Sequence, residues 1–334
     1  MNWNQGFSAR YYMTLVEPRT WRDVQRYEIT GGSVSRAAGS LMEAADIDMT
    51  DAPQSESWIR IYLDARQNDI GTREALFTGL LSTPATQWDG SRRSYRAECY
   101  SVLQPAADVL LQRGWYAPAG MNGAKLIAEL LSCGPAPVSY ADNSPILSAT
   151  IVAEDQEMNL TMAQRILEAI GWRIRITGMG EINVIPKATE PAVIFDAFEN
   201  DSIEMAITDA FDRFKCPNVF RATYNDMSAV ARDDDPESPL STVVRGREIW
   251  MQESVSLMSE NENIAEYALR RLKEEQSPAR SVQYTRRYRP DITVGDIICL
   301  HHPAQGIDGN FLVKSQKIEL GYGGRTTEEA EWQT

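Results

Sequence analysis

Histidine and cysteine are scarce in this chain of 334 residues, which has two of the first and four of the second. The cysteines lie far apart and form no C-x-x-C pair, so we expect reduced, mostly buried thiols rather than disulfides. His301 and His302 are the only residues that could serve as an imidazole base in a Ser-His-Asp or Cys-His scheme. The composition therefore disfavours nucleophilic catalysis.

Long apolar runs and positive charge are also in short supply. No stretch of 18 apolar residues occurs, and Met1–Gln5 has neither a basic nor an apolar signal-peptide region, so we expect no signal peptide and no membrane span. With 33 Lys and Arg against 47 Asp and Glu, the net charge is −14. Specific nucleic-acid binding needs a basic surface, so it is not expected, although an acidic surface suits a wall past which DNA slides.

The residues that could suggest a metal, a cofactor or a catalytic site lack the necessary spacing. In a strand, Cys299 and His301 would face away from His302, so the three cannot converge on one ion. The acidic run Asp233–Asp235 ends at a proline and lacks the spacing of a calcium loop. Gly178–Gly180 and Gly321–Gly324 lack the strand-loop-helix context of a phosphate loop. We expect no metal, no cofactor and no catalytic residues.

Strand patterns dominate the first third of the chain. Alternating and β-branched segments bounded by turn residues predict several strands, and no long helix interrupts them. A turn at Trp88–Gly90 would let the predicted strand 74–83 pair with the predicted strand 94–102. We therefore predict an antiparallel first β-barrel over residues 1–112. The predicted strands are 10–16, 27–30, 58–63, 74–83 and 94–102.

The middle of the chain, residues 113–190, predicts a small α/β insert. Leu126, Ile127, Leu130 and Leu131 lie on one face of a helix over residues 122–132. A second apolar face predicts a helix that Asn159 caps and Gly171 ends. Residues 172–184 follow as a hairpin with its turn at 178–180.

The last part, residues 191–334, returns to strands and predicts a second β-barrel. Residues 219–224 and 242–253 read as extended, the charged segment 231–239 as a surface loop, and 263–276 as a short helix. The tract 281–320 alternates and is broken by turns at Val294–Asp296 and Gly306–Gly309. The fold class is therefore α+β and mainly β, with two antiparallel barrels flanking the insert.

The C-terminal tract resembles the end of phage tail baseplate hub proteins of the late-control and gp27-like group. It shares their arginine-rich strand, the Gly295-Asp296 turn into an apolar strand, and the strand that begins Gly306-Ile307-Asp308-Gly309. The helix at 263–276 and the helix and hairpin at 159–186 are similar to elements of those hubs. The resemblance covers most of the chain and implies tail-tube-like barrels.

This resemblance implies a structural role in the virion. Three copies would form a ring that adapts a sixfold tail tube to a threefold central spike and lets DNA pass. The implied partners are the other two copies, a tail tube or distal tail protein, the spike and the tape measure protein. The protein would be assembled in the host bacterial cytoplasm into the tail baseplate. Two alternatives remain open: a tail-associated peptidoglycan hydrolase and a carbohydrate-binding adsorption protein.

One basic cluster, Arg280, Arg286, Arg287 and Arg289, stands out from the acidic bulk. Strand alternation sends Arg287 and Arg289 to the face opposite Arg286, and one of these faces should be exposed because guanidinium groups are rarely buried unpaired. Such a row could accept carboxylates from a neighbouring subunit or the spike. The alternative is a solvated strand that only offsets the acidic charge.

Overall fold

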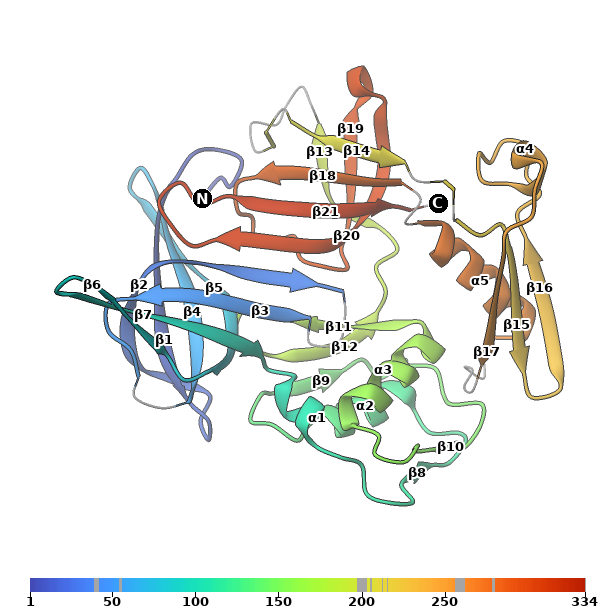
Figure 1. Ribbon diagram of the computed structural model, residues 1–334, viewed down its shortest axis with the longest axis horizontal. Helices are drawn as coiled ribbons and strands as arrows, with labels where there is room; N and C mark the ends of the chain where they lie inside the picture. The colour runs from blue at the N-terminus through green and yellow to red at the C-terminus, as the bar shows by residue number, and fades with distance from the viewer. Residues whose placement is uncertain are drawn as a thin grey trace.

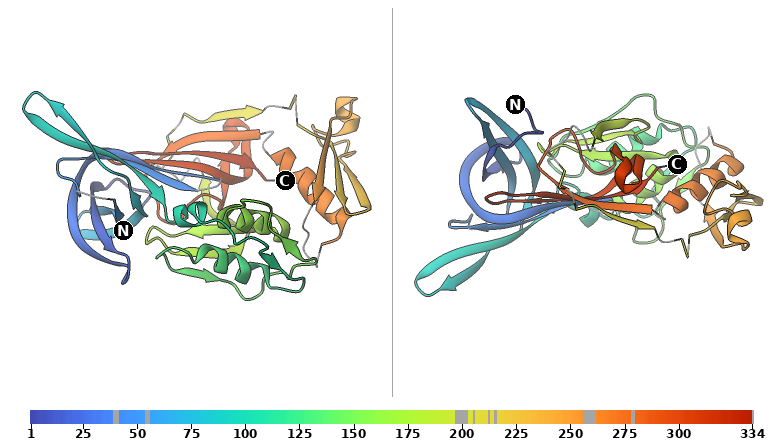
Figure 2. Two further views of the ribbon diagram at one scale, coloured as in Figure 1. Left: turned by 60° about the horizontal axis from the view of Figure 1, so that its bottom comes forward. Right: turned by 90° about the horizontal axis from the view of Figure 1, so that it is seen from above.

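The computed structural model describes residues 1–38, 42–53, 56–196, 203–204, 206–211, 213–214, 216–255, 262–277 and 280–333 (Figure 1). The chain is α+β and mainly β, as the sequence predicts. Its two strand-rich halves are joined by one large sheet, and a helical unit packs beneath them (Figures 1 and 2). No helix of the described residues is long and apolar enough to cross a membrane.

Six strands of the first half pair in a path that returns to its start. β1 pairs with both β4 and β2, and the path between these runs β4-β5-β7-β3-β2, all antiparallel. β6 adds to the outside of β7 as a hairpin. The strands are β1 (Ser8–Glu17), β2 (Arg22–Ala37), β3 (Glu43–Met49), β4 (Ser57–Gln67), β5 (Ile70–Leu81), β6 (Ala85–Asp89) and β7 (Arg92–Ser101).

One long strand, β20 (Ile307–Glu319), belongs to both halves. Along one edge it pairs first with β19 and then with β2, while its other edge pairs with β21. β21, β18 and β14 follow antiparallel, and β13 pairs with β19. The bounds are β13 (Pro191–Asp196), β14 (Thr208–Phe211), β18 (Arg280–Arg286), β19 (Ile297–His302), the short helix η2 (Pro303–Gln305) and β21 (Thr326–Trp332).

The helical unit contains the predicted helices and hairpin. Gly171 ends α3 in the left-handed conformation, with φ 67°, which glycine adopts without strain. The hairpin β11-β12 follows and pairs with β9. The bounds are α1 (Gln104–Asp108), β8 (Tyr116–Ala117), α2 (Gly123–Leu131), β9 (Val138–Tyr140), β10 (Ile151–Val152), α3 (Asn159–Ile170), β11 (Trp172–Ile176) and β12 (Ile182–Pro186).

A separate three-stranded sheet lies at the opposite end of the molecule from the first half (Figure 1). α5 begins with a capping box formed by Asn263 and Glu266 and packs its apolar side on this sheet. The bounds are β15 (Val219–Tyr224), β16 (Met227–Arg232), α4 (Thr242–Arg245), β17 (Trp250–Val255) and α5 (Ile264–Gln276).

Four main apolar clusters hold these parts together. One lies inside the first half, one in the second half, one under α5, and one runs from Val102 to Val184 through α1, α2 and α3. Tyr288, Ile318 and Leu320 join the first-half cluster from late in the sequence. The two halves therefore share a core as well as a strand. The division at residues 112 and 190 stays a prediction.

Several local predictions differ from the structure. Asn159 is the first residue of α3 rather than its cap, and its side chain donates to the Leu130 carbonyl. Residues 242–253 contain the short helix α4 before β17, because Ser241 caps a turn that Gly246 ends. The second half was expected to be antiparallel, but β13 runs parallel to β19. Ala231 and Arg232 belong to β16 rather than to the predicted surface loop. β3, β6, β16 and α1 are among the elements that the sequence analysis does not predict.

Candidate partner interface

The arginine cluster divides into one exposed and three largely covered side chains. Arg280, at the start of β18, forms two bonds to Asp209 of β14, at 3.1 and 2.9 Å. Arg289 forms two bonds to Asp291, at 3.0 and 2.6 Å, and its side chain is 14% exposed. Burial alone would raise the pKa of Asp291, but the Arg289 guanidinium lowers it below the usual value. Both arginines are thus engaged within the chain.

Arg286 is fully buried, so of the two faces that alternation separates, its face is the covered one. Its Nε and Nη2 donate to the two carboxylate oxygens of Glu328 on β21, at 2.7 and 2.5 Å, and both side chains are 0% exposed. Alternation placed Arg286 on the same face as Val282 and Tyr284, and all three are buried. Its acidic partner Glu328 lies 42 residues later in the chain.

Arg287 is the exposed member of the cluster. β18 ends at Arg286, so Arg287 lies just past it, and its Nη1 donates to the Asn4 carbonyl at 3.2 Å. It lines an open hollow of about 1460 Å³, to which Arg66 and Arg325 also contribute, with Glu204 as the acidic lining residue. We call this the arginine hollow. It is a positively charged recess on an acidic protein.

A buried polar ladder crosses the junction of the two halves, next to Arg286. It consists of side chains from five neighbouring strands: Glu43, Arg36, Gln316, Glu328 and Arg286. Arg36 donates to Glu43 at 2.9 Å and to Gln316 at 2.6 Å, and Gln316 donates to Glu328 at 2.6 Å. Arg36 lies opposite both Glu43 and Gln316, and Gln316 lies opposite Glu328. A one-residue slip of β20 would break both of these Gln316 contacts, to Arg36 and to Glu328.

Glu43 is the end of the ladder that titrates near neutrality. Burial raises the pKa of Glu43 to about 7, although Arg36 acts in the opposite direction. The Oε1 atom of Glu43 accepts a hydrogen bond from Arg36. Its buried Oε2 atom accepts none from the described residues. The remaining charges, Arg36, Glu328 and Arg286, have hydrogen-bond partners inside the ladder. Each of these three charged side chains therefore has a hydrogen-bond partner in the ladder other than Glu43.

The turn of the β11-β12 hairpin docks the helical unit onto the first half. The Met179 carbonyl accepts from the Trp21 indole at 2.9 Å and from Arg60 at 3.0 Å, and the Gly178 carbonyl accepts from Thr78 at 2.7 Å. A Cβ on Gly178 would lie 1.7 Å from the Ala75 carbonyl oxygen. Only glycine fits this approach.

Replacing Gly178 with alanine should push the hairpin off the first half. We expect Gly178→Ala to lower the free energy of unfolding by roughly 1–3 kcal/mol, the usual range for an overpacked contact. Urea unfolding followed by tryptophan fluorescence measures the change. Gly321→Ala is the matched control, because a Cβ there would meet nothing within 4 Å. Equal stability of the two variants would show that the turn does not dock tightly.

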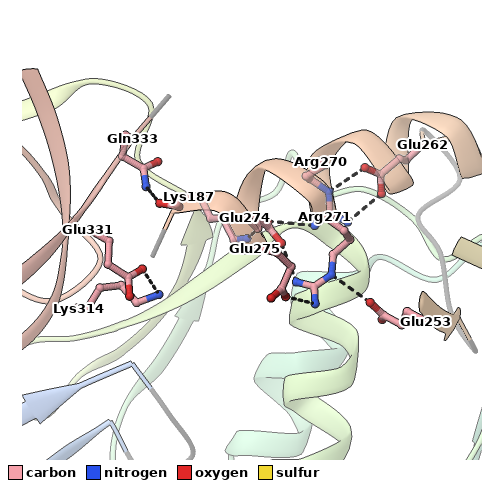
Figure 3. A network of polar contacts seen from close by, with 11 residues as sticks. Lys187, Glu253, Glu262, Arg270, Arg271, Glu274, Glu275, Lys314, Glu331 and Gln333 are labelled. Atoms are coloured by element: carbon pink, nitrogen blue, oxygen red, sulfur yellow. Dashed lines mark hydrogen bonds and ion pairs between the residues drawn. The ribbon is translucent and has the colours of Figure 1, made fainter. Parts of the chain in front are cut away.

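Ion pairs around α5 tie the far sheet to the helical unit (Figure 3). Arg271 bonds Glu253 of β17 at 3.1 Å and Glu274 at 2.8 Å. Lys187, just after β12, reaches Glu274 at 2.7 Å. Burial would raise the pKa of Glu274, but Lys187 and the neighbouring arginines lower it to about 2. This network fixes α5 between two parts of the chain.

The residues considered for metal or imidazole chemistry do not assemble into a site. His301 Nδ1 lies 3.0 Å from Asp308 Oδ1, and this hydrogen bond raises the pKa of His301. His302 lines the arginine hollow, and burial lowers its pKa. Among the described residues, no group of three His, Cys, Asp or Glu could hold a metal ion.

Solved structures with a similar fold include two proteins named as tail proteins. The prophage MuSo2 43 kDa tail protein from Shewanella oneidensis superposes with a TM-score of 0.71 at 13% identity, over 98% of both chains. A tail protein from Neisseria meningitidis MC58 gives a TM-score of 0.72 at 14% identity, over 98% of this chain and 97% of the other.

A more distant similarity extends to secretion systems. The Escherichia coli c3393 protein, a type VI secretion component described as similar to the T4 tail proteins gp27 and gp5, gives a TM-score of 0.53 at 9% identity. It is matched over 91% of this chain and 73% of its own. No protein-family model and no curated protein sequence matches the chain. The resemblance predicted from the sequence is thus confirmed for the fold, and the chain has the fold of these tail proteins.

Proposed function

We propose that the chain is a structural hub protein of a phage or phage-like tail baseplate. The observation that carries this proposal is the likeness over 98% of the chain to two proteins named as tail proteins. A match of this extent leaves no described domain outside the shared fold. The role therefore belongs to the architecture as a whole rather than to one added site.

The hub would act as a ring of three copies. Each copy would present two tube-like barrel units. Three copies would then match a sixfold tube with their six barrel units, and a threefold spike with the threefold symmetry of the ring. The closed pairing path of the first six strands supports the first unit. The strands around β20 would supply the second. A ring closes when adjacent copies meet head to tail.

The proposed partners are the tail tube or distal tail protein, the tape measure protein and a central spike. Support for a spike comes from fold similarity to chains in structures titled PdpA-VgrG complexes, with TM-scores of 0.57 and 0.56. These titles describe those proteins only. In the assembled tail the chain would be a virion baseplate component through whose acidic lumen DNA passes, since each copy carries −14.

The proposal also assigns no catalytic step to the chain. A peptidoglycan gel-clearing assay of the purified protein tests the hydrolase alternative, and clearing would overturn a purely structural role. A glycan array tests the carbohydrate-binding alternative in the same way. We expect neither clearing nor glycan binding.

The decisive experiment measures the mass of the assembled protein and asks whether ring formation requires Arg287. Light scattering should give three times the 37.5 kDa chain, alone or with tail partners, and negative-stain microscopy should show a ring. Arg287→Glu, which reverses the exposed charge beside the arginine hollow, should keep the melting temperature but impair ring formation or spike binding.

Arg10→Glu is the matched control, since the Arg10 side chain is 67% exposed on β1 and does not line the arginine hollow. A chain that stays a single copy in the assembled tail would contradict the hub proposal. A ring unaffected by Arg287→Glu would return the arginine cluster to a role within the chain.

A further inference from the structure

The β6-β7 hairpin is a two-stranded arm that projects from the body of the molecule (Figures 1 and 2). β6 pairs with β7 alone among the described strands, and every residue of β6 is exposed. An isolated two-stranded hairpin is marginally stable in water and gains stability when it packs on something else. The arm therefore has the geometry of an element that docks outside its own chain.

The face of the arm that carries Trp88 continues the core face of the first half. On β7, Tyr95, Ala97 and Cys99 share one face, and Ala97 and Cys99 are buried in the first-half cluster. Register places Trp88 opposite Arg93 and Thr86 opposite Tyr95, so these side chains belong to the same face.

This face is buried at Ala97 and Cys99 but is exposed to solvent farther out along the arm. Trp88 is 67% exposed. The Arg93 guanidinium lies 4.5 Å from the Tyr95 ring centroid and 6.0 Å from that of Trp88, which orders the aromatic pair. A tryptophan and an arginine on an uncovered face are the residue types that dominate the binding energy of protein interfaces.

The charge of the arm identifies its partner. Residues 85–96 contain three arginines and one aspartate, a net charge of +2, which leaves −16 on the rest of the chain. Opposite charges attract at an interface, whereas the arm is repelled by other basic surfaces. The acidic body of a second copy of this chain has the complementary charge, and the outer edge of β6 can add to a neighbouring sheet through its backbone.

We propose that the β6-β7 hairpin is the arm with which each copy of the chain binds the next copy head to tail, with Trp88 buried in the neighbour. This inference rests on the proposed hub function, because a head-to-tail contact repeated three times closes a ring. The arm supplies the apolar anchor and the positive charge, and the neighbouring copy supplies the acidic surface.

A photo-crosslinking experiment on the full chain tests the contact. Benzoylphenylalanine replaces Trp88 in one sample and Tyr116, which is 64% exposed on the helical unit, in a control sample. Irradiation should produce chain-to-chain crosslinks from position 88 and not from position 116. Trp88→Ala combined with Arg93→Glu should raise the concentration for half-maximal association by at least about tenfold, the effect of losing one interface anchor.

The outcomes separate this inference from the hub proposal. A threefold mass without crosslinks at position 88 overturns the arm contact and leaves the hub intact. A wild-type chain that stays single at every concentration, with and without tail partners, overturns the ring and the arm together. Crosslinks from position 88 to added duplex DNA, in place of a second chain, would show that the arm binds nucleic acid. Unchanged association of the double variant also overturns the arm contact.

Discussion

Arg286→Met is expected to lower the free energy of unfolding by about 3–5 kcal/mol, the cost of leaving a buried charge without its partner. The variant removes both hydrogen bonds that Arg286 donates to Glu328, a carboxylate that is 0% exposed. Methionine fills part of the space but cannot compensate the charge. Urea unfolding followed by circular dichroism measures the loss.

A double variant distinguishes the charge from the packing. Arg286→Met combined with Glu328→Gln removes both charges and keeps an acceptor for Gln316, so it should recover most of the lost stability. Arg10→Met is the surface control, because the exposed Arg10–Glu28 pair should contribute less than about 1 kcal/mol. If the double variant is no more stable than the single one, the buried charge is not the cause.

Stability should fall as the pH rises from about 4.5 to 7, because of Glu43. Its pKa is raised from 4.5 to about 7 by burial, so between these values the folded chain holds a proton that the unfolded chain has released. A shift of this size corresponds to about 3 kcal/mol. The stabilisation is full below pH 4.5 and is lost as the pH rises through 7.

The control for this pH dependence is a residue that cannot titrate. Glu43→Gln should show a flatter stability profile over this interval, so that its stability relative to the wild type rises with pH. Glu28→Gln, an exposed change on the same strand as Arg36, should track the wild type throughout. Parallel profiles of the wild type and Glu43→Gln would mean that Glu43 does not titrate in this range.

Local signals explain the parts of the fold that the sequence predicts. The hairpin over 172–184 needs only alternation and a glycine turn between adjacent segments, and it forms as β11 and β12. The helix before it ends at Gly171, where the left-handed conformation stops it. These features depend on neighbours in sequence, and periodicity reads them directly.

Periodicity does not predict the buried polar ladder, because most of the side chains that bond in it are distant in sequence. Alternation puts Arg286 on the same face as Val282 and Tyr284, but it does not identify the acidic partner that a buried guanidinium group needs. The partner, Glu328, is set by the register of β18 and β21, and nothing in the local pattern specifies that register. Glu328 does share a face with Thr326 and Ala330, both buried, which is the one signal that could have found it.

The sequence predicts the turn of the arm but not the strand that precedes it. The turn at Trp88–Gly90 was expected, and the structure has it between β6 and β7, but β5 was expected to pair there directly. β5 meets β7 only over Gly79–Leu81, because the chain leaves the first half and returns as the arm. Its exposure depends on the absence of a covering element, which is a property of the whole fold.

β20 has a mechanical consequence, since it is the strand that both halves share. A force that pulls the halves apart acts along β20. It must shear the backbone hydrogen bonds on both edges of this continuous strand. Shear loads many hydrogen bonds at once, whereas peeling breaks them one at a time. The two halves should therefore bear tension as a single stiff body.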